Sequence, residues 1–187
     1  MIESDPPPEA PAAPGRSSAP DARTRVVPDL RKVPVEILSQ LGWLSGVFHL
    51  PPRQSLSEFL SLAAQTVKVT RVRLSQEPDV VPFIAMRRDA VWLVAPSLDL
   101  GEEGQGIAGY TTYRDVACFL PAHILRGSLA VPISLRLSDY LQQQSHVIVL
   151  RHCLLTSYGE TANSPHARSL STVLVNVHGT LGISEST

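Results

Sequence analysis

The 187-residue sequence has few aromatic residues, only two cysteines and almost no net charge. Aromatic residues make up 5% of the chain and hydrophobic residues 43%, so a core must consist mainly of Val, Leu, Ile and Ala. A net charge of −1 produces no strong field that would attract nucleic acid or an acidic membrane. No apolar run approaches the roughly 20 residues that span a bilayer, and the acidic, proline-rich start has no secretory pattern. These absences predict a cytoplasmic protein that binds no membrane.

The two cysteines, Cys118 and Cys153, stand in apolar surroundings. No Cys-x-x-Cys pair exists, which excludes a zinc ribbon and a thioredoxin motif. Because free cysteine is among the most frequently buried residues, we expect two small core residues. A disulfide or a paired redox site is the alternative.

An internal repeat organises the rest of the chain. Six residues between positions 44 and 60 recur 81 residues later in a gapless window of 17 residues, where average composition gives roughly one match. The identical pairs are Leu44 and Leu125, Gly46 and Gly127, Pro51 and Pro132, Leu56 and Leu137, Ser57 and Ser138, and Leu60 and Leu141. The repeat predicts two copies of one structural unit. Its residues build turns and cores and carry little chemistry.

The composition divides the chain into four segments: 1–32, 33–97, 98–112 and 113–187. The first is rich in Pro and Ala and poor in large apolar groups, so we expect a disordered tail that serves as a tether or as a docking peptide. The segment 98–112 is glycine-rich and acidic and is expected to be a connector. The other two segments are the repeated modules.

Each module is predicted to contain two strands, a helix and three further strands. In the first module the strands are expected at 33–38, 43–50, 67–74, 81–86 and 90–95, and the helix at 55–64. The helix start is marked by a capping box, Ser55 with Glu58 three residues later. In the second module the corresponding segments are 116–120, 123–131, a helix at 135–143, and 147–155.

The last two strands of each module are predicted to form a hairpin, with turns at 87–89 and 177–179. After a longer polar loop at 158–169, the register between the modules is expected to shift by nine residues. Phe83 then corresponds to Val173, and Val91 to Leu181.

These elements predict a mainly β fold of the α+β type, with two tandem ββαβββ modules. A unit of about 60 residues buries too little surface to be stable alone. The modules are therefore expected to pack about a pseudo-two-fold axis, or each to roll into a small barrel with its helix covering one end.

The predicted helix of the second module carries Arg-Leu-Ser-Asp-Tyr-Leu at 136–141, preceded by Gly127 and Pro132 and followed by a strand and a β-hairpin. This block resembles a bacterial family of unknown function. That family is built of small strand–strand–helix–strand–strand modules whose helix has an Arg-Leu-Ser-Asp-Phe-Leu-like motif. The first module departs from it, with Gln54 and Ser55 where arginine stands. The resemblance implies a fold and assigns no catalytic residue.

No motif for catalysis or metal binding stands out. The chain lacks Gly-x-Ser-x-Gly and Ser-x-x-Lys, and no two histidines have the helical spacing of a zinc-binding pair. The glycine-rich stretch at 101–106 lacks the Lys-Ser/Thr of a phosphate loop. We therefore expect no enzyme, no cofactor and no metal.

Basic residues are the one patterned polar feature. Five of them fall on two predicted strands of the first module: Lys68, Arg71, Arg73, Arg87 and Arg88. The second module has mostly uncharged counterparts: Val149, His152, Leu154, Val177 and His178. Such charge is common on edge strands, where it blocks aggregation between sheets. The alternatives are a surface for an anion, a nucleotide or nucleic acid, and a site for an acidic protein. The shortage of exposed aromatics disfavours nucleic acid.

The sequence therefore predicts a non-enzymatic protein-interaction or regulatory module. It would bind a protein partner, or a second copy as a homo-oligomer, through sheet edges or a groove between the modules. The alternative is a small-molecule or nucleotide sensor that binds an anionic ligand between the modules, near Arg71, Arg73 and Arg87.

Overall fold

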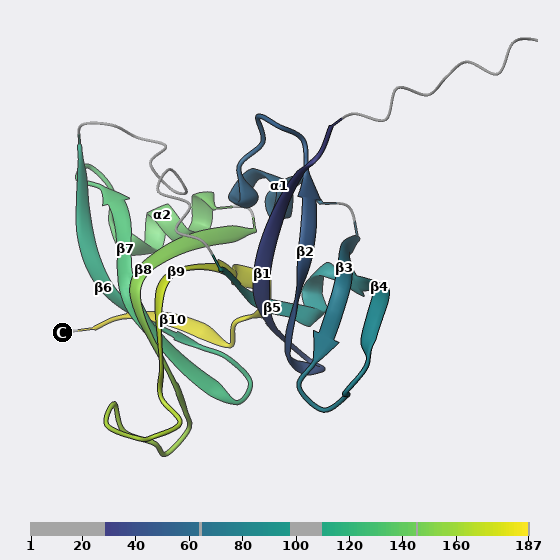
Figure 1. Cartoon of the computed structure of the whole chain (residues 1–187). Helices are drawn as coiled ribbons and strands as arrows, with labels where there is room; N and C mark the ends of the chain where they lie inside the picture. The colour runs from purple at the N-terminus through teal and green to yellow at the C-terminus, as the bar shows by residue number, and fades with distance from the viewer. Residues whose placement is uncertain (1–28, 64, 98–109, 145, 187) are drawn as a thin grey trace, which may run out of the picture.

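The computed structural model describes residues 29–63, 65–97, 110–144 and 146–186 (Figure 1). The predicted tail and connector lie mostly outside these ranges. The first strand already begins at Arg31, inside the segment predicted as tail, and the Arg31 guanidinium donates a hydrogen bond of 2.9 Å to the carbonyl of Gln54.

Strands and helices follow the same order in the two halves of the chain. The first half contains β1 (Arg31–Ser39), β2 (Gly42–Leu50), α1 (Leu56–Leu62), β3 (Thr66–Leu74), β4 (Val80–Arg87), the 3-10 turn η1 (Arg88–Ala90) and β5 (Val91–Pro96). The second half contains β6 (Thr111–Phe119), β7 (His123–Pro132), α2 (Leu137–Gln143), β8 (Val147–Ser157), β9 (Arg168–Asn176), η2 (Val177–Gly179) and β10 (Gly182–Glu185). The prediction of a mainly β fold is confirmed, and both helices are shorter than expected.

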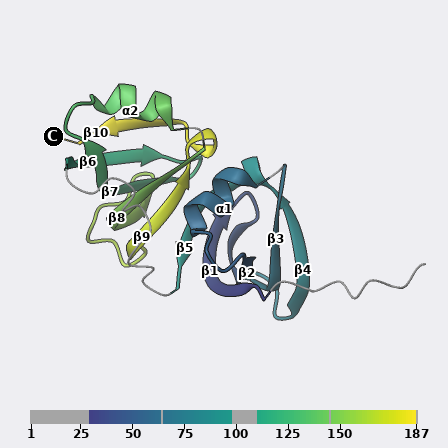
Figure 2. The same cartoon turned by 90° about the horizontal axis from the view of Figure 1, so that it is seen from above.

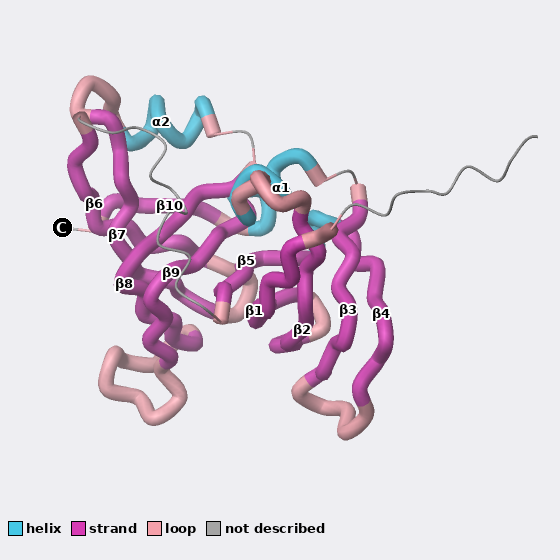
Figure 3. Tube along the Cα trace, turned by 45° about the horizontal axis from the view of Figure 1, so that its top comes forward, coloured by secondary structure: helices cyan, strands magenta, loops and turns pink. Residues whose placement is uncertain are grey.

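The ten strands of the described residues form one antiparallel sheet that does not close on itself. Its order is β10-β6-β7-β8-β9-β5-β1-β2-β3-β4. The two halves meet where β5 pairs with β9, at Leu93 with Val175 and Val94 with Leu174. The strands β4 and β10 form the two ends of the sheet, on opposite sides of the molecule (Figure 2). Both helices lie on the same side of the strands (Figure 3).

The predicted hairpin between 81–86 and 90–95 is wrong. β4 pairs with β3, and η1 redirects the chain so that β5 pairs with β1 instead. The second half does the same, because η2 leads to β10, which pairs with β6. The physical reason is burial on both faces of β5, since the consecutive residues Leu93, Val94 and Ala95 are all buried. Such a run is typical of a strand covered on both sides and not of a hairpin arm at the sheet end.

Residues 81 positions apart occupy matching places in the ladders of β1–β3 and β6–β8. Each half has a bulge at the same place, at Arg71 and at His152, and both residues have a φ of 51°. Gly46 and Gly127 face these bulges. A Cβ on Gly127 would lie 2.8 Å from the Cys153 sulfur, so glycine is required for the strands to approach.

From β4 and β9 onward the spacing is 89 residues, and not the predicted 90. Thr66 pairs with Arg87, and Val147 with Asn176. The register shift is therefore eight residues. A slip of one residue in a strand moves every side chain to the other face, so this correction decides which residues of the two halves correspond.

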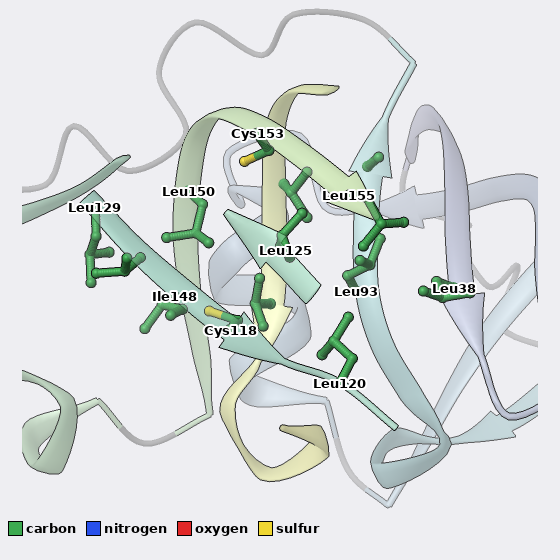
Figure 4. Close-up of a cluster of buried hydrophobic side chains, with 14 of the residues drawn as sticks. Leu38, Leu93, Cys118, Leu120, Leu125, Leu129, Ile148, Leu150, Cys153 and Leu155 are labelled. Atoms are coloured by element: carbon green, nitrogen blue, oxygen red, sulfur yellow. The ribbon is translucent and has the colours of Figure 1, made fainter. Parts of the chain in front are cut away.

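Two hydrophobic clusters form the core, and each takes residues from both halves. Leu38 and Leu93 of the first half pack in the cluster of the second half, beside Cys118 and Leu120 (Figure 4). In return, Leu174 of β9 belongs to the cluster of the first half. The halves therefore share their interiors.

Both cysteines are free and buried in the cluster of the second half, which confirms two small core residues. Burial raises the pKa of the Cys118 and Cys153 thiols to about 12, so neither ionises near neutral pH.

Candidate functional site

Four of the five predicted basic residues are exposed on the neighbouring strands β3 and β4, and the fifth, Arg88, is half-buried. Lys68, Arg71 and Arg73 are exposed on β3. Arg87 is exposed and forms an ion pair with Asp89, which holds the pKa of that carboxyl below its ordinary value. Arg88 is half-buried and has a structural role, since its guanidinium donates a 2.9 Å hydrogen bond to the carbonyl of Ala63 at the end of α1.

Two of the arginines share a cavity in the first half. Arg71 and Arg73 line a space of about 490 Å³ together with residues of β1, β2 and β4. Gly46, which faces the bulge at Arg71, is also part of its wall. A positive φ is uncommon for a residue with a side chain, and strain of this kind gathers at functional sites. The cavity lies within the first half and not between the halves, and Arg87 is not among its lining residues.

The asymmetry of charge follows from the pairing of β5 with β9. In the corrected register, Lys68 corresponds to Val149 and Arg87 to Asn176. Val149 and Asn176 lie where the second half packs on the first, whereas Lys68 and Arg87 lie at the free end of the sheet and face solvent.

Polar contacts reinforce the junction between the halves. The Arg168 guanidinium on β9 lies 2.8 Å from the Glu36 carboxylate on β1 and 4.2 Å from the ring centre of Trp43 on β2. Asn176, which is buried, donates hydrogen bonds of 2.9 Å to the carbonyl oxygens of Arg88 and Val91. These contacts fix the position of β9 against the first half.

A groove of about 440 Å³ runs beside this junction. It is lined by α1 on one side and by β7, α2 and β8 on the other, and Glu58 and Tyr140 are among its residues. Glu58 already receives hydrogen bonds in the capping box of α1, which lowers the pKa of its carboxyl. The Glu58 carboxylate is therefore already engaged in the cap of α1.

The two ends of the sheet expose apolar side chains. Val80 and Phe83 of β4 are 46% and 50% exposed, and Leu181, just before β10, is 71% exposed. Ile183 of β10 and Leu141 of α2 pack against the cluster of the second half and are half-buried. The sequence did not predict this second group, because the order of strands in the sheet decides which apolar residues stay uncovered.

Two absences among the described residues concern metal binding and membrane crossing. No group of three His, Cys, Asp or Glu side chains in that part of the chain could hold a metal ion. Among the same residues, no helix has the length and apolarity needed to cross a membrane.

Comparison with known proteins found no matching family model, no similar curated protein and no similar solved structure.

Proposed function

We propose that this protein is a non-enzymatic protein-interaction module of the cytoplasm, built from two tandem ββαβββ units. The observation that carries the proposal is the open sheet, whose terminal strands β4 and β10 have no neighbour on one side among the described residues. Unpaired strand edges with exposed apolar side chains are the surfaces to which a partner adds an extended segment. Two free, buried thiols fit a reducing compartment.

The tandem arrangement is supported by the matched ladders of the two halves. Bulges, helices and 3-10 turns recur at spacings of 81 and then 89 residues. Within the units, β9 corresponds to β4 and β10 corresponds to β5. The pairing of β5 with β9 therefore joins unlike ends of the two units, in a head-to-tail manner. A head-to-tail join leaves one end of each kind free, here β4 and β10. It differs from a pseudo-two-fold arrangement, in which like ends of the two units would meet.

Affinity capture from native lysate tests the interaction function. The bait is the full chain, compared with variants Phe83→Asp on β4 and Leu181→Asp beside β10, and retained proteins are identified by mass spectrometry. We expect a protein that the wild type retains and one of the two variants loses. If correctly folded bait retains no protein reproducibly, the interaction function is wrong.

A second candidate function, the binding of a small anionic ligand, is favoured by the cavity lined by Arg71 and Arg73. Arg71 and Arg73 are both among its lining residues, and guanidinium groups are hydrogen-bond donors that suit phosphate or carboxylate. A ligand that binds the native state raises the melting temperature by mass action. A thermal-shift screen of nucleotides and phosphorylated metabolites should stabilise the wild type and not the Arg71→Ser, Arg73→Ser double variant. No stabilisation by any member of the screen argues against this function.

A further inference from the structure

We infer that the end of the second half, formed by α2 and β10, binds an extended apolar segment of a separate protein in the way that the first half binds β9. The inference rests on the proposed interaction function and specifies its site and the kind of partner. The chain itself contains an occupied example of the same position, where β9 pairs with β5.

The occupied example is the face of the first half covered by β8 and β9. Leu174 of β9 is buried with Leu60 of α1 and Val94 of β5, and these side chains surround a residual cavity of only about 10 Å³. The backbone of β9 pairs with β5 at Val94 and Leu93. Strand pairing and apolar burial therefore occur together at this position, and Leu60 and Val94 are 5% and 1% exposed.

The vacant counterpart lies in the second half. The matched ladders place Leu141 where the first half has Leu60, and Ile183 where it has Val94. Both residues pack on the second cluster but remain half-buried, since no described strand pairs with the outer edge of β10. Leu181 takes the place of Trp92 and is the most exposed of this group. The same apolar surface is thus sealed in one half and open in the other.

A second copy of this chain does not fit the vacant position. Head-to-tail addition of another copy would place its β3 and β4 over Leu141 and Ile183. In the occupied position, β8 and β9 provide Val149 and Leu174 to the apolar contact. The corresponding residues of β3 and β4 in a second copy are Lys68 and Ala85. Burial of an unpaired ammonium group beside leucine and isoleucine is costly. The occupant is therefore a segment with apolar residues at these places, supplied by another protein.

The β9 strand defines what that segment must contain. It runs antiparallel to β10, with an apolar residue opposite Ile183 in the role of Leu174 and small or branched residues beside it. Two residues further on, a short amide side chain such as that of Asn176 suits the turn, because Asn176 donates to two carbonyl oxygens at η1 and β5. The segment carries no charge over the stretch that corresponds to 169–176, as β9 carries none there.

A peptide with the sequence of residues 168–177 is the direct probe of this site. Labelled with a fluorophore, it is titrated with the full chain and binding is followed by anisotropy. The chain's own β9 is tethered at high effective concentration, so the peptide does not displace it from β5. We expect saturable binding, and hydrogen exchange should slow at the β10 amides of 182–185, because strand addition protects outward-facing N–H groups.

Matched variants locate the binding. Ile183→Asp and the more exposed Leu181→Asp should each weaken peptide binding at least about tenfold, the equivalent of about 1.4 kcal/mol. Phe83→Asp, at the other end of the sheet, should leave it unchanged. A peptide in which the counterpart of Leu174 is aspartate should not bind. Absence of binding by the parent peptide, or binding that the β10 variants do not alter, would overturn the inference.

The outcomes separate this inference from the interaction function on which it rests. A captured partner that is lost with Phe83→Asp and kept with Leu181→Asp would support the function and overturn the site proposed here. Concentration-dependent self-association that Leu181→Asp abolishes, measured by sedimentation, would show that a second copy is the occupant and would overturn the assignment to another protein.

Discussion

Replacement of Leu174 by alanine tests the shared core most sharply. Leu174 lies on β9 of the second half, yet its side chain is 1% exposed within the cluster of the first half. Truncation of a buried leucine to alanine costs about 2–5 kcal/mol, and the well-filled surroundings favour a value of about 3 kcal/mol. For a chain of this size, 1 kcal/mol lowers the melting temperature by about 2–4 °C, so a drop of about 6–12 °C is expected.

The assay is urea unfolding, with calorimetry for the melting temperature, and Leu181→Ala serves as the control. Leu181 is 71% exposed, so its truncation should change the free energy of unfolding by no more than about 0.5 kcal/mol. Since each cluster contains residues of the other half, Leu174→Ala should lower a single cooperative transition. A loss below about 1 kcal/mol, or a transition that splits in two, would refute the packing of β9 into the first half.

Three further predictions follow from local features. Gly127→Ala should destabilise the chain by about 1–3 kcal/mol in urea unfolding, because its new Cβ would lie 2.8 Å from the Cys153 sulfur; an unchanged midpoint contradicts the tight strand contact. Ser55→Ala removes the capping box of α1 and should cost about 1 kcal/mol, whereas Arg136→Ser supplies the side-chain cap that α2 lacks and should stabilise; equal effects of both changes would contradict the difference in capping. Burial lowers the pKa of His123, so the native state binds fewer protons than the unfolded chain. Its contribution to stability is complete above the unfolded pKa of about 6.5 and is lost as pH falls below it. His123→Gln should therefore flatten the fall in melting temperature between pH 7 and 5, and an unaltered slope would exclude this role.

The elements with local signals could be predicted from the sequence, and their connections could not. The capping box at Ser55 located the start of α1 to within a residue, and β-branched runs located most strands. The predicted partner of β5 was wrong, because the sequence of a short turn at 88–90 does not show whether the next strand pairs with β4 or with β1. The pairing depends on contacts with residues distant in the sequence, such as those of β9.

The candidate site shows the same division. The asymmetry of the basic residues was visible in the sequence, but its cause was not. A register that was wrong by one residue matched Arg87 with Val177, whereas the ladders match it with Asn176, which lies at the junction. Only the order of strands, with β5 paired to β9, shows that Lys68 and Arg87 lie at the free end of the sheet. The open surface at Leu141 and Ile183 left no signal in the sequence, since apolar residues of a core and of an uncovered face look alike.

The contribution of Leu174 to the first cluster also has a consequence for synthesis on the ribosome. The residues that it covers are translated earlier, and Val94, the later of the pair Leu60 and Val94, precedes Leu174 by about 80 residues. At about 5–20 residues per second, the first half waits roughly 4–16 s for the strand that seals it. During that interval the nascent chain exposes both an apolar face and the free edge of β5. A chaperone that binds extended apolar segments could bind the first half during this interval, until β9 is synthesised and covers the exposed surface.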